Sequence, residues 1–260
     1  MKTGLVSITF RNKTPEEIVT LVKKGGLDGI EWGGDVHVPH GDLNTAEQVK
    51  KMTLDAGLEI ASYGSYYRAA YSETAEQPIK FSEVLKTAIK LNAPTIRVWA
   101  GVKGSAASTQ EEREAVIADL RRIGSLAAQE GITISLEYHG GTLTDTNESA
   151  QQLIKEVNHH NIRLYWQPSN GKDFTYCIEG LKAIINDVSN VHVFHWAFTP
   201  DNKIERRPLA EGKAVWMEYL KELKKKSVDR YAMIEFVRNE SDQQFLEDAA
   251  TLRQWIKKEE

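Results

Sequence analysis

The sequence has a single cysteine, Cys177, in 260 residues. One cysteine cannot form an internal disulfide, and it argues against a metal cluster held by thiolates. No apolar run is long enough to cross a bilayer, and the first residues lack the apolar stretch and cleavage site of a signal peptide. We therefore expect a cytoplasmic protein with no membrane partner.

The chain also lacks an excess of basic residues. It has 33 Lys and Arg against 37 Asp and Glu, a net charge of −4. Nucleic-acid binding needs a basic surface, so we expect no nucleic-acid partner. Hydrophobic residues make up 41% of the chain and charged residues 27%, which is typical of a globular protein with a sizeable core.

Short apolar segments alternate with amphipathic ones along the whole chain. Strands are predicted at residues 4–10, 28–32, 58–63, 94–99, 132–137, 162–166, 191–195 and 231–236. Helices are predicted at residues 14–26, 45–56, 78–91, 110–129, 147–157, 176–186, 212–225 and 241–257. Several of these strands are apolar almost throughout, as expected for strands that helices cover on both faces.

Eight strand–helix units predict an α/β fold, a single (β/α)8 TIM barrel formed by residues 1–260. The alternative is an open doubly wound sheet, which usually has fewer units and a glycine-rich phosphate turn after its first strand. Here the first strand continues into TFRNKTP, without such a turn. In a barrel, the polar residues at the carboxyl ends of the strands form the active site.

Four polar residues end successive predicted strands: Glu137, Gln167, His195 and Glu235. Neighbouring strands lie about 4.8 Å apart, so these side chains can converge at the barrel mouth. Two carboxylates, an imidazole and an amide oxygen suit a divalent cation, with Mn²⁺ or Mg²⁺ favoured and Zn²⁺ or Co²⁺ as alternatives. His192 is predicted to point the opposite way from Val193, toward the helices.

Other residues near the strand ends are candidates for contact with a substrate. Arg207, or Arg206 beside it, and Arg238 could bind an anionic group through paired donors. Lys103 could polarise a substrate oxygen, and His139 could act as a general acid or base. Glu31 lies at the end of the second predicted strand and His37 in the loop after it, and both are expected to contact substrate. Aromatic residues that could pack on a sugar ring are Trp32, Tyr63, Tyr66, Tyr67, Trp99, Trp166 and Trp196.

Together these segments resemble the sugar phosphate isomerase/epimerase superfamily, the xylose isomerase-like TIM barrels. The resemblance is carried by DGIEWGG, AGVKGSA, LEYHGGTLTDT, VFHW, RRPLAEGKAVW and MIEF. The segment from TIRVWAGVKGSA to LEYHGGTLTDT is most similar to the 3-dehydroshikimate dehydratase branch. The resemblance implies a divalent metal at Glu137, Gln167, His195 and Glu235, with the two glutamates also moving protons. It is also compatible with a homo-oligomer.

The sequence departs from the family pattern at two strand ends. The family often has Trp-Asp-Pro-Gly where this chain has Trp166, Gln167, Pro168 and Ser169. Glutamine keeps an oxygen donor but loses the charge, so metal affinity should fall and the ion should be a stronger Lewis acid. The family also often has His-x-Lys-Asp where this chain reads His195-Trp-Ala-Phe198, which removes an acidic neighbour.

These features predict a metal-dependent isomerase or epimerase that acts on a small-molecule carbohydrate, a sugar, sugar phosphate or related polyol. Glu137 and Glu235 would take and return a proton next to a carbonyl. One alternative is a lyase, a dehydratase or β-eliminase of a keto-polyol or keto-sugar. The other is a metal-free sugar-binding protein produced by the change at Gln167. An endonuclease is disfavoured because its multi-metal site needs more histidines at the strand ends.

Overall fold

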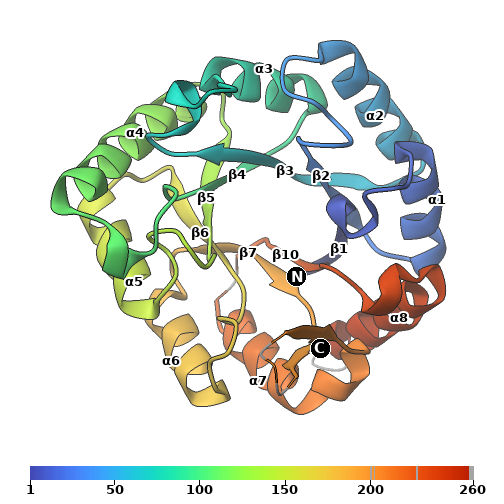
Figure 1. Cartoon of the computed structure of the whole chain (residues 1–260). Helices are drawn as coiled ribbons and strands as arrows, with labels where there is room; N and C mark the ends of the chain where they lie inside the picture. The colour runs from blue at the N-terminus through green and yellow to red at the C-terminus, as the bar shows by residue number, and fades with distance from the viewer. Residues whose placement is uncertain (200, 202, 227, 258–260) are drawn as a thin grey trace.

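A computed structural model describes residues 1–199, 201, 203–226 and 228–257. Eight parallel strands close into a barrel in the order β1-β10-β7-β6-β5-β4-β3-β2 (Figure 1). The barrel strands are β1 (Lys2–Val6), β2 (Gly29–Gly33), β3 (Glu59–Arg68), β4 (Thr95–Trp99), β5 (Thr133–Glu137), β6 (Ile162–Trp166), β7 (Val188–Val193) and β10 (Tyr231–Ile234). The (β/α)8 architecture predicted from the sequence is therefore confirmed.

The helices form a ring outside the strands (Figure 1). They are α1 (Pro15–Gly25), α2 (Leu43–Asp55), α3 (Phe81–Leu91), α4 (Gln110–Gln129), α5 (Asn147–Val157), α6 (Phe174–Ile184), α7 (Lys213–Lys224) and α8 (Asp242–Lys257). Short 3₁₀ helices are η1 (Ser7–Phe10), η2 (Ser72–Thr74), η3 (Ser105–Ala107), η4 (Leu209–Gly212) and η5 (Arg238–Glu240). Among the described residues, no helix combines the length and apolar character needed to cross a membrane.

Local sequence signals place several of the helix ends. Thr14 caps α1 and Thr109 caps α4, and in each case a glutamate three residues later bonds back to the cap backbone. These reciprocal bonds satisfy N–H groups that a helix leaves unpaired at its start. Asn92 and Asn158 end α3 and α5 in the left-handed conformation, which asparagine tolerates well.

Two parts of the barrel differ from the prediction. The seventh barrel strand, β7, ends at Val193 rather than at residue 195. The chain then forms an unpredicted antiparallel hairpin of β8 (Trp196–Phe198) and β9 (Ile204–Arg206). Both differences fall beside the candidate site.

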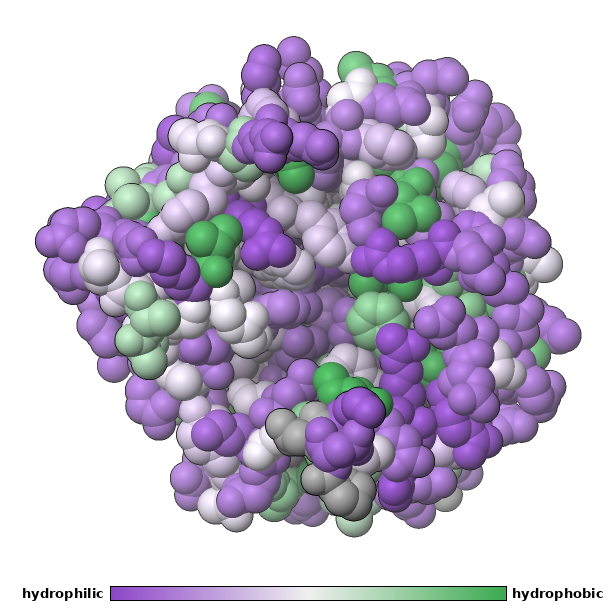
Figure 2. Space-filling view, in the orientation of Figure 1, coloured by the Kyte–Doolittle hydropathy of each residue, from purple (hydrophilic) through white to green (hydrophobic). Residues whose placement is uncertain are grey.

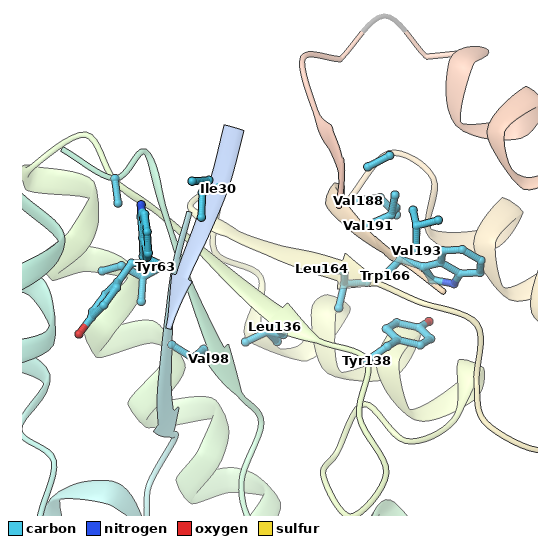
Figure 3. Close-up of a cluster of buried hydrophobic side chains, with 14 of the residues drawn as sticks. Ile30, Tyr63, Val98, Leu136, Tyr138, Leu164, Trp166, Val188, Val191 and Val193 are labelled. Carbon is cyan, nitrogen blue, oxygen red and sulfur yellow. The ribbon is translucent and has the colours of Figure 1, made fainter. Parts of the chain in front are cut away.

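The strands separate two sets of side chains. Val6, Ala61, Tyr165 and Met233 come from four different strands and form one cluster. Tyr165 on β6 also bonds across to Glu31 on β2, four strands away in the barrel order, so this cluster faces the barrel axis. A larger cluster faces the helices and includes Leu136, Leu164, Trp166, Val191 and Val193 (Figure 3).

Asp248 on α8 is a buried carboxylate that gives the fold a pH-dependent weakness. Its Oδ1 accepts hydrogen bonds from the backbone N–H of Leu209 and from Gln244, both at 2.9 Å. Burial nevertheless raises the pKa of Asp248 to about 6. In the unfolded chain, the same carboxyl has a lower pKa and ionises more easily. As pH rises above the unfolded pKa, the ionised form therefore favours the unfolded chain, and the free energy of unfolding falls.

We therefore expect Asp248→Asn to stabilise the protein as pH rises. The gain should be near zero close to pH 4 and reach on the order of 2 kcal/mol above pH 6. Urea unfolding at several pH values measures it, with Glu179→Gln, an exposed carboxylate on α6, as the control. A gain that is the same at pH 4.5 and pH 7.5 would contradict the assignment.

Candidate active site

Glu137, His192 and Glu235 meet inside the mouth of the barrel. One ligand atom from each lies within 4.8 Å of the other two, and all three residues are buried. They come from the end of β5, from β7 and from the residue after β10. Figure 2 shows this face of the molecule, where the mouth forms a central hollow among largely hydrophilic residues.

Arg97 on β4 joins two carboxylates at the base of this site. Its Nε donates to Glu31 Oε1 at 2.7 Å, and its Nη1 pairs with Glu137 Oε2. The Arg97 and Glu31 side chains are 2% and 0% exposed. Buried charges of this kind are tolerated only when they are paired and hydrogen-bonded.

Glu31 is fully satisfied within the barrel. Besides Arg97, it accepts hydrogen bonds from Ser62 Oγ and Tyr165 Oη, both at 2.6 Å. Burial disfavours its charged form, yet Arg97 and His192 hold the pKa of the Glu31 carboxyl well below its usual range. Glu31 was expected to contact substrate, but the structure places it beneath the mouth as part of the support for Arg97.

Glu137 presents two different oxygens. Oε2 is occupied by Arg97 and by the indole N–H of Trp99, which donates to it at 2.5 Å. Oε1 lies 3.7 Å from His192 Nδ1 and forms no hydrogen bond in the described part of the chain. Glu137 is therefore held through one oxygen and offers the other to the mouth.

Gln167 completes the group around His192. Its amide nitrogen donates to the carbonyl of Tyr138 at 2.5 Å, which turns the amide oxygen toward His192 Nδ1, 3.1 Å away. Glu235 Oε2 lies 3.5 Å from the same nitrogen. Ligands around an ion 2.1 Å away lie about 3.0 Å apart at right angles and about 3.4 Å apart at tetrahedral angles. The distances from His192 Nδ1 to Gln167 and Glu235 are close to this spacing, and Glu137 Oε1, 3.7 Å away, lies slightly beyond it. The residue types and their positions suit a divalent cation.

The charge balance of the site points the same way. Three carboxylates, from Glu31, Glu137 and Glu235, face one permanent cation, Arg97, which leaves an excess of two negative charges. Burial, with the neighbouring charge of Glu137, raises the pKa of Glu235. Burial lowers the pKa of His192, but the carboxylates of Glu235 and Glu31 raise it by more, so the pKa lies above its ordinary value. The side chains thus tend to take up protons, and a divalent cation would balance the same excess.

The structure changes the expected histidine of this group. His192, predicted to face the helices, faces the barrel axis and contacts Glu31, Glu137 and Glu235. His195 lies past the end of β7 and is only half-buried. Its ring is so close to Gly212 that a methyl group there would lie 2.8 Å from Nδ1. The reason is that Val191 and Val193 pack outward, so the residue between them points inward.

The aromatic residues expected at the mouth fall into two groups, one that faces the helices and one that lies at the mouth. Trp32, Tyr63, Tyr67 and Trp166 are buried in the layer between strands and helices, not at the mouth. Trp166, expected to bind substrate, packs against Trp216 and Tyr219 of α7, with ring centroids 6.4 and 5.0 Å away. Tyr66 and Trp99 remain partly exposed at the mouth, with centroids 5.4 Å apart.

Other expected site residues lie apart from the three-residue group. Lys103 pairs with Glu112 on the surface, and Arg207 pairs with Glu205. His37 is buried and bonds to Ser7 at 2.9 Å. Arg238 lines a cavity of about 560 Å³ beside the hairpin, together with Arg206, Trp196 and Phe236. Of the two adjacent arginines, Arg206 rather than Arg207 lines this cavity.

His139 lies at the mouth as expected. Its ring stacks on Trp99 with centroids 4.5 Å apart. Nδ1 lies 2.6 Å from the carbonyl of Gly140, which can only accept, so Nδ1 carries the proton. Nε2 is the nitrogen left for a ligand. Sequence reasoning missed Arg97, which lies in the middle of β4, and Arg68, which ends β3.

Comparison with known proteins agrees with this architecture. A sequence model of the family described as xylose isomerase-like TIM barrel matches residues 19–258. A 3-dehydroshikimate dehydratase of Bacillus anthracis is 30% identical over 261 residues, covering 91% of each chain.

Solved structures share the fold. The crystal structure of a probable 3-DHS dehydratase from Bacillus anthracis matches with a TM-score of 0.81 and 25% identity, over 97% of this chain and 99% of that one. A xylose isomerase-like TIM barrel protein of Mycobacterium smegmatis, solved in complex with magnesium, matches with a TM-score of 0.74 and 16% identity. This match covers 99% of this chain and 97% of that chain.

The buried position of Arg97 predicts a large loss of stability on its removal. Arg97→Met should destabilise the protein by about 3–5 kcal/mol, because Glu31 and Glu137 would be left buried without their cation. Urea unfolding at pH 7 measures this. Arg207→Met, which removes an exposed and paired arginine, should change stability by less than about 0.5 kcal/mol. Equal effects of the two substitutions would contradict the importance of the buried pair.

The geometry also predicts which histidine binds metal. After dialysis against Mn²⁺, we expect one ion per chain in the unaltered protein and in His195→Ala, measured by elemental analysis. His192→Ala should weaken binding by at least about tenfold, because a ligand of the group is lost. If His195→Ala lost the metal and His192→Ala kept it, this prediction would be wrong, and His195 would be the ligand, as expected from the sequence.

Proposed function

Because the chain belongs to the family of xylose isomerase-like TIM barrels, we propose that it is a divalent-metal-dependent dehydratase of a polyhydroxy ketone. The observation that carries this proposal is the meeting of two carboxylates with one imidazole in the buried mouth. Elimination next to a carbonyl needs a base and charge stabilisation at one place, and this group can provide both.

The ion would be held by Glu137, Gln167, His192 and Glu235. When bound, it would stabilise negative charge that develops on the substrate carbonyl oxygen. The neutral amide of Gln167 leaves more of the ion's charge uncompensated than a carboxylate would. His192 would bind through Nδ1, the atom nearest to Gln167 and Glu235.

The protein's own groups would move the protons. A glutamate, Glu137 or Glu235, takes the proton on the carbon next to the carbonyl. The electron pair left behind forms the carbon–carbon double bond as the β-carbon loses its hydroxyl. His139, when both ring nitrogens carry a proton, gives the proton on Nε2 to that hydroxyl, which leaves as water, and keeps its bond from Nδ1 to the carbonyl of Gly140. Trp99 keeps Glu137 in place through its hydrogen bond to Oε2.

The choice of dehydratase over isomerase rests on a similarity in sequence. The 30%-identical relative over 91% of the chain carries the name 3-dehydroshikimate dehydratase. An isomerase or epimerase remains the second candidate, because two carboxylates beside one ion can also take and return a proton without elimination. The two reactions differ in one product, water.

We expect the purified protein with Mg²⁺ or Mn²⁺ to convert 3-dehydroshikimate to a product lighter by one water, with new ultraviolet absorbance from the added unsaturation. Mass spectrometry and absorbance measure it. Glu137→Gln and Glu235→Gln should lower the rate at least about a hundredfold, since each carries a proton-transfer or ligand role. Glu111→Gln, an exposed carboxylate on α4, is the control.

A product of unchanged mass from a ketose would favour the isomerase. Absence of both reactions, with no uptake of metal, would overturn the proposal and favour a binding protein.

A further inference from the structure

Arg68 stands at the end of β3, beside the candidate base. Its guanidinium carbon lies 4.1 Å from the ring centroid of Trp99. The same indole donates its N–H to Glu137 Oε2 at 2.5 Å and stacks with the ring of His139. Trp99 therefore connects Arg68 directly to the residues that would carry out the chemistry.

The charge of Arg68 has no partner among the residues that the structure describes. No ion pair or side-chain hydrogen bond is formed by its guanidinium within the part of the chain that the structure describes. Most other arginines around the mouth are paired, Arg11 with Asp35, Arg97 with Glu31 and Glu137, and Arg206 with Glu240. Arg238 also lacks an ion pair among the described residues, but it is exposed to solvent.

The position of the Arg68 guanidinium over the Trp99 ring leaves its N–H donors without an acceptor among the described residues. A guanidinium that lies against an indole uses its flat face there, and its N–H donors point outward in the plane. Arg68 is partly buried, and burial lowers its pKa with no carboxylate offsetting the effect. Leaving a partly desolvated cation without a counter-ion costs free energy, which an incoming anion would recover.

We propose that Arg68 is a specificity-determining residue that binds an anionic group of the substrate, a role that rests on the proposed function. The anion is a carboxylate or a phosphate, since both accept paired hydrogen bonds from one guanidinium. The substrate then lies with its acidic group at Arg68 and its reacting carbon near Glu137. Neutral sugars lack this contact and bind more weakly.

Binding experiments with matched acids and neutral compounds test this role. The probes are shikimate and its methyl ester for the carboxylate, and fructose 6-phosphate and fructose for the phosphate. Each is titrated by calorimetry into the full chain with Mg²⁺ present. We expect at least one acid to bind about tenfold or more tightly than its neutral partner. The acid that does so identifies the group.

Substitutions then assign the preference to Arg68. Arg68→Met should remove the preference by weakening the acid and leaving the neutral compound unchanged, and Arg68→Lys should retain part of it. Arg163→Met, a partly exposed arginine at the start of β6, is the control and should keep the preference. Circular dichroism spectra confirm folding, and Arg68→Gln replaces Arg68→Met if that variant does not fold.

Two results would overturn the role of Arg68. One is a wild-type protein that binds neither acid more tightly than its neutral partner, including no binding at all. The other is a variant in which acid and neutral compound weaken equally, which would mean that Arg68 only packs on Trp99. Shikimate lacks the reacting ketone, so the preference is measured without turnover. If the protein prefers the acid but releases no water from 3-dehydroshikimate, the role of Arg68 in anion binding stands and the proposed dehydratase activity is wrong.

Discussion

The buried guanidinium of Arg97 is the interaction on which the barrel mouth depends. It lies between Glu31 and Glu137, where water cannot stabilise an unpaired carboxylate. Ser62 and Tyr165 hold Glu31 from two other strands, one of them across the barrel. The position of Glu137 is therefore set by the folded chain itself. Hydrogen bonds and ion pairs of this kind hold the reacting groups in position whether or not a ligand is bound.

The barrel and most of its mouth could be predicted from the sequence. The alternation of apolar and amphipathic segments fixes the order of strands and helices, and strand ends pointed to Glu137, Gln167 and Glu235. The predicted direction of His192 was wrong, because β7 is buried on both faces. In such a strand, the pattern does not say which residues face the axis, and a shift of one residue reverses every side chain.

Contacts between distant strands were the part that the sequence could not provide. Arg97 reads as an ordinary polar residue in TIRVW, and only the closed barrel places it between Glu31 and Glu137. Trp166 looked like a sugar-stacking residue, but the pleat of β6 turns it toward α7. Lys103 follows a strand end in a loop, where sequence gives no side-chain direction, and it reaches Glu112 instead of the mouth.

Trp99 has a further consequence for how proteins with this architecture could diverge. Its indole N–H holds Glu137, whereas its ring face carries Arg68. The two contacts use different parts of one side chain, so the residue at position 68 can change without disturbing the bond to Glu137. Proteins that evolve from this chain could therefore bind new substrates through substitutions at position 68 and keep the same reacting carboxylates.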